Sequence, residues 1–249
     1  MSRADGVRPI IPDWPAPGRV RAASSTRTGG TSAGPWGTLN LADHVADERE
    51  AVVRNRARLR DELGLPREPR WLSQRHGARV VEAGAQANAA PADGSVAREP
   101  GIVCAVLAAD CMPVLLCNRG ATVVAALHAG WRGIAAGIVE AGVRATGAPP
   151  AELLAWLGPA IGPERYEVGP DVRDAILAGD PDADGAFRRT GSADRWQANL
   201  ERIVRGRLAR CGVGSVHGGR WCTASEPGRF FSHRRDGVTG RMATLIWLD

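Results

Sequence analysis

The sequence contains no lysine, so arginine supplies all 32 of its basic side chains. A chain without lysine has neither the lysine of a Walker-type phosphate loop nor a lysine that forms a Schiff base, which excludes both kinds of catalytic site. Any anion must be held by arginine, by backbone N–H groups or by a helix N-terminus. Because the arginines are scattered and no nucleic-acid-binding motif is present, we expect no nucleic-acid partner.

Long apolar runs and paired cysteines are also missing. The longest apolar stretch, Ile102–Cys117, is interrupted by Asp110 and Pro113 and is too short to span a bilayer, so we expect no membrane partner. The N-terminal residues lack the apolar core of a signal peptide. Five cysteines are an odd number in a chain of this size, which argues against a disulfide framework and for a reducing compartment. These features predict a cytoplasmic protein.

The composition is that of an ordinary globular protein, with 249 residues, 44% hydrophobic and 24% charged. We predict a loose N-terminal lead-in at residues 1–18 and one domain at residues 19–249. The formal net charge of +5 favours an acidic small-molecule substrate. Nothing in the sequence specifies an oligomeric state.

Hydrophobic periodicity predicts short strands that alternate irregularly with helices. The predicted strands are Arg19–Ser25, Val103–Leu107, Val114–Cys117, Thr122–Leu127, Leu153–Leu157, Val213–Thr223, Phe230–His233 and Arg241–Leu248, the last two joined by a turn at Asp236-Gly237. The predicted helices are Glu48–Leu63, Gly133–Thr146, Asp171–Leu177 and Asp194–Cys211. This order favours an α/β (α+β) fold, a mixed sheet with helices outside, over a doubly wound parallel sheet.

Three polar side chains lie where a purely structural sequence would not place them. Cys111 and His128 each come at the end of an apolar strand, and His76 lies in the segment Ser-Gln-Arg-His-Gly just before another apolar pair. Strand ends that open into loops are a usual place for catalytic groups, because the scaffold is rigid and the loop gives access.

These three residues allow more than one interpretation. One thiolate and two imidazoles suit a zinc ion whose fourth position stays open to water. Without metal, the same residues form a nucleophilic Cys–His pair. In the simplest interpretation the cysteine is a small buried hydrophobe and the histidines are hydrogen-bonded structural residues. The spacings between them match no local metal motif, so spacing alone does not decide.

Two further segments offer anion-binding groups. The stretch His128–Gly133 leads directly into a helix, so its backbone N–H groups and Arg132 are suited to receive an anion, although a plain strand-to-helix turn explains it equally. Arg234, Arg235 and Arg241 lie around the predicted turn near the C-terminus, where they either bind phosphate or form a solvated charged turn.

Taken together, these segments resemble the YfiH-like family, whose members are variously named multicopper polyphenol oxidase, purine nucleoside phosphorylase and peptidoglycan editing factor. The resemblance runs in family order from about residue 20 to the C-terminus. It rests on Thr26–Pro35, Leu39–Leu41, Gln74–Gly77, Ala109–Leu116, His128–Gly133, Gly158–Gly162, Tyr166–Gly169, Cys222–Thr223 and Phe230–Ala243.

The resemblance implies a single domain of layered mixed β-sheets flanked by helices. It implies that His76, Cys111 and His128 are the metal-binding and catalytic residues, with Zn²⁺ as the metal and Cu²⁺ as a possible one, and Asp110 as a further catalytic residue. On the matching stretches and the anion-binding segments we expect substrate-binding roles for Arg27, Asn40, Arg132, Arg235 and Arg241.

Purine nucleoside chemistry is the first function implied, with phosphorolysis of adenosine, inosine and methylthioadenosine and deamination of adenosine. In that reaction Asp110 either shuttles protons or orients Cys111. The alternative is an amidase that releases a wrong amino acid from a UDP-muramoyl conjugate. Copper-dependent phenol oxidation is disfavoured, because five histidines are too few for several copper centres. A non-enzymatic protein with a relic site is disfavoured by the intact histidines and cysteine.

The chain departs from the family pattern at a few positions. Arg75 stands where a small apolar residue is usual, Ala109 replaces a threonine and His233 replaces a tyrosine, while Glu164-Arg165 fills a place that often contains cysteine or histidine. None of these departures removes a candidate metal ligand. They bear on substrate preference, above all if Arg75 or His233 lines the pocket.

Overall fold

The protein is built on three β-sheets, seen in a computed structural model that describes residues 6–84, 89–191 and 194–249. The largest sheet has the strand order β11 (Ser215–Gly218), β7 (Leu153–Leu157), β5 (Met112–Asn118), β6 (Val124–Ala129), β3 (Gly94–Ala97) and β2 (Val80–Glu82). A second sheet consists of β1 (Val20–Ser24), β12 (Met242–Leu248) and β4 (Cys104–Ala108). A small third sheet consists of β8 (Glu167–Val168), β10 (Trp196–Ala198) and β9 (Phe187–Arg189).

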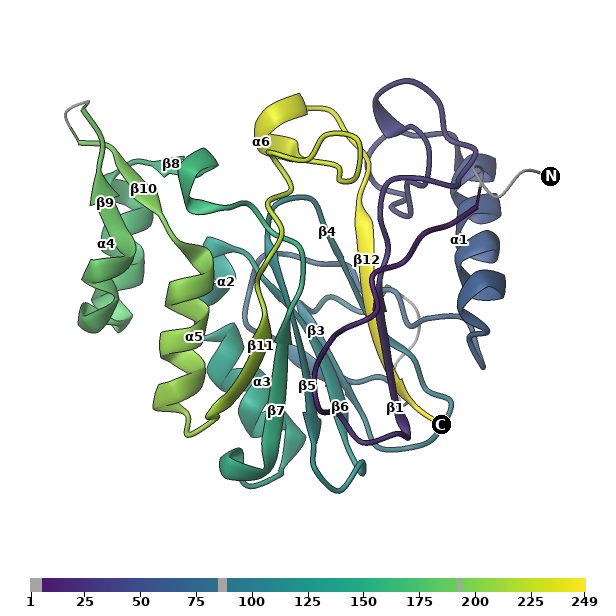
Figure 1. Cartoon of the computed structure of the whole chain (residues 1–249), viewed down its shortest axis with the longest axis horizontal. Helices are drawn as coiled ribbons and strands as arrows, with labels where there is room; N and C mark the ends of the chain where they lie inside the picture. Colours follow the sequence, from purple (N-terminus) through teal and green to yellow (C-terminus); the bar gives the residue numbers. More distant parts are fainter. Residues whose placement is uncertain (1–5, 85–88, 192–193) are drawn as a thin grey trace.

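Most helices flank the two larger sheets from outside, one lies beside the small third sheet, and a short one lies at the end of the sheets (Figure 1). They are α1 (Arg49–Leu63), α2 (Trp131–Ala135), α3 (Ile138–Thr146), α4 (Pro170–Gly179), α5 (Leu200–Arg210) and the short α6 (His233–Asp236). In the large sheet the outer pairs β11–β7 and β2–β3 are parallel and the inner pairs antiparallel, so the sheet is mixed. The predicted architecture of layered mixed sheets with flanking helices is confirmed.

Alternating side chains on the central strands define the layers. On β5, Val114 and Leu116 face the core shared with α3 and α5, whereas Leu115 and Cys117 face the core shared with the second sheet. A third core lies between the second sheet and α1 and contains Leu59 of α1 and Leu245 of β12. The large sheet is therefore covered on both faces, and each fully buried aliphatic side chain contributes about 1.5–3 kcal/mol of stability. This packing fixes the strand ends that carry the candidate site.

Two predicted helices are shorter than their hydrophobic periodicity suggested. The predicted helix Gly133–Thr146 is divided into α2 and α3 at Gly137, whose φ of 89° lies in the left-handed region. The predicted helix Asp194–Cys211 begins only at Leu200, because the Asn199 side chain accepts a hydrogen bond from the Arg202 backbone N–H and caps it. Trp196, which falls within the predicted helix, lies in β10 instead.

The predicted C-terminal hairpin is also wrong. Residues Phe230–His233 do not form a strand, and the Asp236-Gly237 turn instead ends α6. The physical reason is that β12 already pairs with β1 on one edge and with β4 on the other, which leaves no edge for a hairpin partner. Likewise, only Ser215–Gly218 of the predicted strand Val213–Thr223 pairs in the sheet, parallel to β7.

The N-terminal segment contacts the body of the protein within its described part, residues 6–18. Val7 and Ile10 are buried, and Ile10 pairs with Ser24 through two backbone hydrogen bonds. Residues 1–5 of the predicted lead-in lie outside the described residues, and the division at residue 18 stays a prediction. All five cysteines are free thiols, and none of the described helices has the length and apolarity needed to cross a membrane.

Candidate functional site

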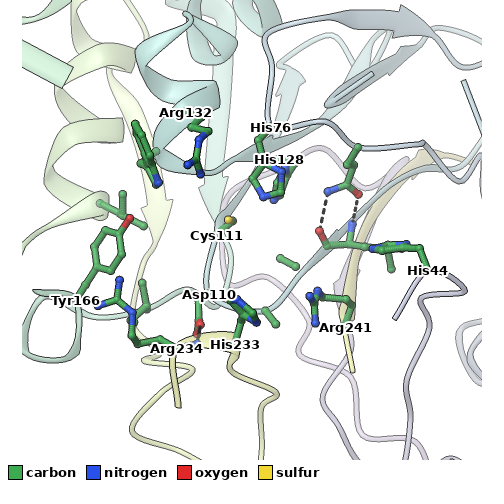
Figure 2. A pocket seen from close by; sticks show the side chains of 17 residues that line it. His44, His76, Asp110, Cys111, His128, Arg132, Tyr166, His233, Arg234 and Arg241 are labelled. Atoms are coloured by element: carbon green, nitrogen blue, oxygen red, sulfur yellow. Dashed lines mark hydrogen bonds between the residues drawn. The ribbon is translucent and has the colours of Figure 1, made fainter. Parts of the chain in front are cut away.

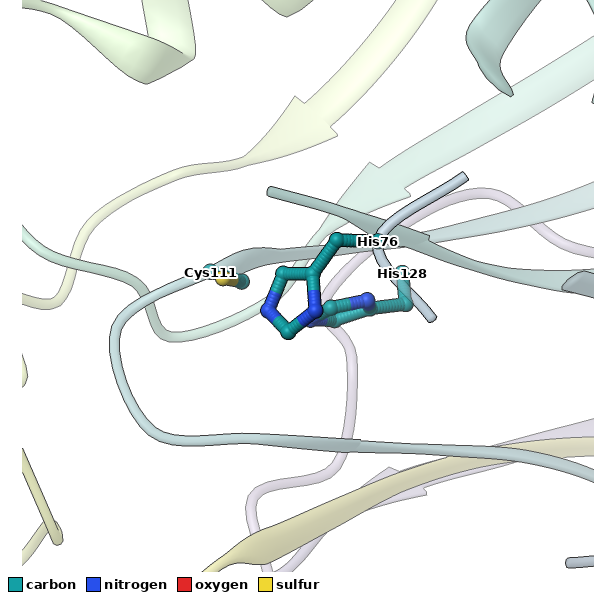
Figure 3. Close-up of side chains that lie close together, drawn as sticks. All are labelled: His76, Cys111 and His128. Atoms are coloured by element: carbon teal, nitrogen blue, oxygen red, sulfur yellow. The ribbon is translucent and has the colours of Figure 1, made fainter. Parts of the chain in front are cut away.

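The side chains of His76, Cys111 and His128 come together at one end of the large sheet (Figure 3). Cys111 lies in the turn between β4 and β5, and His128 lies on β6, paired with Pro113 on the neighbouring strand. His76 comes from the loop before β2, with a left-handed φ of 59°. One ligand atom from each side chain lies within 4.8 Å of the others. The structure thus brings the three sequence-predicted residues together.

The three side chains differ in how far they are buried. His128 is only 3% exposed, Cys111 is half-buried and His76 is exposed. The two imidazole rings meet edge to face, with centroids 4.8 Å apart and planes at 77°. The cluster is therefore buried on the side of His128 and open to solvent on the side of His76.

Asp93 organises this cluster, although the sequence reasoning missed it. Its carboxylate accepts hydrogen bonds from the backbone N–H groups of Arg75 (3.0 Å), His76 (2.8 Å) and Gly77 (2.8 Å), and lies 3.0 Å from His128 Nδ1. Its side chain is 2% exposed. With Nδ1–H donating to Asp93, the His128 Nε2 atom is the nitrogen left for a ligand. Asp93 thus fixes the loop of one ligand and the ring of another.

Burial and charge act against each other in the Cys111–His128 pair. Burial alone raises the pKa of Cys111, but the charge of His128 and hydrogen bonds from both histidines outweigh it and lower this pKa to about 6. Burial lowers the pKa of His128, but Cys111 and Asp93 outweigh it and raise this pKa to about 9. Without metal the pair is therefore a thiolate with an imidazolium at neutral pH, and metal binding must displace the His128 proton.

A close approach at Gly130 leaves room for the cluster. A Cβ atom at this position would lie 2.8 Å from Cys111 Sγ and 3.1 Å from His76 Cδ2, so a larger residue would press on two of the three side chains. A thiolate and two imidazoles that converge in this way fit a metal ion, and zinc accepts this set of donors. His76, Cys111 and His128 are therefore the residues that could hold a metal.

The cluster opens into a cavity of about 490 Å³, within the size range of small-molecule sites (Figure 2). Four of the five histidines line it, together with three arginines and a single acidic residue, Asp110. Both oxygens of Asp110 are engaged, one by the Thr223 hydroxyl and the other by the Arg234 backbone N–H at 2.7 Å. Asp110 therefore joins the strand end beside Cys111 to the start of α6.

The structure divides the predicted substrate-binding residues into two groups. Arg132 and Arg241 line the cavity. Arg27 instead donates to the backbone carbonyls of Gly37 and Pro227. Asn40 is fully buried beside Ala42 and Asp47. Arg235 donates to the carbonyls of Thr223 and Phe230. These last three side chains do not line the cavity, so the geometry supports a framework role for them and no direct contact with substrate.

Several cavity residues were not assigned as site residues from the sequence. They are His44, Gln74, Trp131 and Tyr166. Their signal was weak because each comes from a loop or an element end that lies far along the chain from the others. His233, one of the departures from the family pattern, does line the cavity, whereas Arg75 does not.

The arginines of the cavity have no acidic partner in the part of the chain that the structure describes. Arg132, Arg234 and Arg241 form no ion pair with the carboxylates of the described residues. Arg241 is half-buried, and its guanidinium donates to the backbone carbonyls of Thr239 and Gly240. Burial lowers the pKa of this guanidinium, although the charges of Cys111 and Asp110 oppose this. A half-buried cation without a carboxylate is stabilised by a bound anion.

Comparisons with known proteins place the chain in one family. The family described as multi-copper polyphenol oxidoreductase laccase matches residues 21–249. The chain is 50% identical to a Pseudomonas aeruginosa protein and 49% identical to the Escherichia coli protein YfiH, both named purine nucleoside phosphorylase, over 96% of this chain and 98% of each relative.

Solved structures show the same likeness. A Neisseria meningitidis protein described as DUF152 has a TM-score of 0.93 at 47% identity and covers 97% of this chain and 99% of its own. YlmD from Geobacillus stearothermophilus has a TM-score of 0.89 at 34% identity and covers 100% of this chain and 98% of its own. The chain belongs to this YfiH-like family, as its motifs indicated.

The Asp93→Asn substitution tests the positioning of the ligands. An amide keeps the shape of the carboxylate, but it loses the charge and turns a donor toward backbone N–H groups, so we expect zinc affinity to fall about 10- to 100-fold. Competition with a chromophoric chelator measures the affinity. Asp174→Asn, at an exposed position on α4, is the matched control and should leave the affinity unchanged. Equal zinc affinity in the Asp93→Asn variant would show that Asp93 does not position the ligands.

The Cys111 pKa predicts a pH-dependent reactivity in the metal-free protein. Because the thiolate forms as pH rises through about 6, alkylation of Cys111 by iodoacetamide should reach half its maximal rate there. Cys104 and Cys117 should stay unreactive, since burial raises the pKa of each to about 12. His128→Gln should move the Cys111 midpoint upward. Mass spectrometry of the alkylated peptides gives all three profiles, and a midpoint near the ordinary cysteine value of about 8.5 would contradict the ion pair.

Proposed function

We propose that this protein is a purine nucleoside phosphorylase that uses a zinc ion held by His76, Cys111 and His128. The observation that carries the proposal is the position of this cluster, on the wall of a cavity whose three arginines form no ion pair with carboxylates of the described residues. Closely similar relatives that span the same length carry the name purine nucleoside phosphorylase, which supports the substrate class.

Phosphorolysis needs an anion site beside the sugar carbon, and the cavity offers one. A phosphate oxygen forms a bond to C1′ of the ribose while the bond from C1′ to the base breaks, and the electron pair of that bond leaves with the base. We assign the phosphate to Arg241, which has donor nitrogens available beside the two backbone carbonyls that it already binds. His44 lies next to Arg241 on the same side of the cavity (Figure 2).

The remaining groups of the site keep it in shape. When bound, zinc would supply a Lewis acid with one position left open by its three protein ligands. Asp93 holds His128 and the His76 loop, and Asp110 holds α6 and with it the cavity residues His233 and Arg234. With both of its oxygens engaged, Asp110 serves here as a positioning residue, one of the two roles considered from the sequence.

Hydrolytic deamination of adenosine is the second activity that we propose for this cavity. The same cluster and the same nucleoside are involved, but water attacks C6 of the purine, the bond from C6 to the amino group breaks, and ammonia leaves to give inosine. No contact of the described residues favours the muramoyl amidase. Phenol oxidation by several coppers finds no support either, because the described residues hold one group of three or more candidate ligands.

The direct test is to incubate zinc-loaded protein with adenosine, with and without phosphate, and to separate the products by chromatography. We expect adenine only with phosphate and inosine irrespective of phosphate. Cys111→Ala removes one ligand of three and should lower both rates at least about 100-fold without unfolding the protein. Cys211→Ala, which removes a half-buried thiol at the end of α5, is the matched control.

Either of two outcomes would contradict this function. An active Cys111→Ala variant would move the chemistry away from the cluster. A metal-bound wild-type protein without any product would remove nucleosides as the substrate class and leave the muramoyl conjugate as the next substrate to assay.

A further inference from the structure

Tyr166, the only tyrosine of the chain, has a rigidly held backbone at the edge of the cavity. Its N–H donates to the Pro163 carbonyl at 3.2 Å, and its own carbonyl accepts from Ala198 N–H, next to the cap of α5, at 2.9 Å. The guanidinium carbon of Arg234 lies 5.0 Å from the ring centroid. Because backbone and ring are both fixed, the direction of the phenol group is set by the fold.

The hydroxyl group of Tyr166 has no partner among the described residues, although the side chain is almost entirely buried, with 8% of the residue exposed. Figure 2 shows the phenol oxygen directed into the cavity on the side of Arg132. The phenol oxygen is not among the buried side-chain atoms that lack a partner, so it is accessible from the cavity and free to bond to water or ligand. This group is therefore placed to bind whatever fills the cavity.

Apolar residues form part of the cavity wall on the Tyr166 side. Ile161, Tyr166 and Leu200 line the cavity and belong to one continuous apolar core, with Trp131 packed against it. His44 and Arg241 line the opposite side, across Cys111 (Figure 2). Apolar side chains beside a phenol suit a flat heteroaromatic ring, whereas Arg241 with His44 across the cavity suits an anion. Arg132 and Arg234 lie on the Tyr166 side, Arg234 against its ring (Figure 2).

We propose that this wall binds the purine base and that the Tyr166 hydroxyl donates a hydrogen bond to the base as it leaves the sugar. The proposal rests on the phosphorylase function and specifies where the two substrates lie. The C1′–N9 bond breaks with its electron pair passing to the base, and a phosphate oxygen bonds to C1′. The phosphate proton is then transferred to the base, so the products are a neutral purine and ribose 1-phosphate.

Tyr166 has two properties suited to this role. A hydrogen bond to the base strengthens as negative charge develops on it, so the contact favours the transition state more than the bound substrate. Burial, reinforced by the charge of Cys111, raises the pKa of Tyr166, so the phenol remains a neutral donor. It donates a hydrogen bond and does not give up its proton.

The Tyr166→Phe variant removes the hydroxyl and keeps the ring, and its kinetics with inosine and phosphate test the assignment. Because hydrogen bonds to charge are stronger than neutral ones, we expect kcat to fall about 10- to 100-fold and the inhibition constant of free hypoxanthine to rise about 3- to 10-fold. The KM for phosphate should stay within about 2-fold, since a group that does not touch the anion leaves its binding alone. Ser215→Ala, which removes a hydroxyl from β11 outside the cavity, is the control.

The outcomes separate this inference from the function on which it rests. Wild-type protein without phosphorolysis or hypoxanthine inhibition would overturn both. Active wild-type protein with a Tyr166→Phe variant of equal kcat and equal hypoxanthine inhibition would overturn only the role of Tyr166. A variant with weakened phosphate binding and unchanged hypoxanthine inhibition would place the anion, and not the base, at Tyr166. Equal melting temperatures exclude a folding defect.

Discussion

The buried carboxylate of Asp93 is the group on which the arrangement of the site depends. It binds three consecutive backbone N–H groups of the His76 loop and the ring of His128, and the His128 backbone N–H donates to the Asp93 carbonyl at 2.7 Å. A buried carboxylate costs free energy unless its hydrogen-bonding capacity is used, and here four donors use it. The hydrogen bonds and the His128 charge outweigh burial and lower the pKa of Asp93.

The sheets give this carboxylate its fixed position. Asp93 comes immediately before β3, and β3 pairs with β6, which carries His128, while β6 pairs with β5, which follows Cys111. Each of these strands is buried on both faces, so the strand ends cannot move separately without exposing core.

Local sequence signals predicted much of the fold and the cluster itself. Cys111 and His128 follow apolar runs that are typical of buried strands. The Gln-Arg-His-Gly segment matches the family pattern and thereby predicted His76. Asp93 was missed because Ala-Asp-Gly reads as an ordinary turn, and its partners lie elsewhere along the chain. Its role depends on the pairing of β3 with β6, which no local pattern specifies.

The errors have a common physical cause. Trp196 and Leu200 fit a helical period, but Trp196 lies in β10, which pairs with its neighbouring strands. The helix begins only after Asn199, whose side chain caps it. Phe230 and Phe231 have strand-forming side chains, yet both edges of β12 were already paired. Arg27 and Asn40 belong to family motifs, but in the fold they bind backbone groups of neighbouring loops. Motif membership alone does not distinguish a framework residue from one that contacts substrate.

X-ray absorption at the zinc edge of the stoichiometrically loaded protein tests the central claim most directly, because it reports the ligands of the metal independently of any substrate. We predict a shell with one sulfur at about 2.3 Å and nitrogen or oxygen ligands at about 2.0–2.1 Å, and loss of the sulfur in Cys111→Ala. A wild-type shell without sulfur, or a sulfur that remains in the variant, would show that His76, Cys111 and His128 do not hold the metal together.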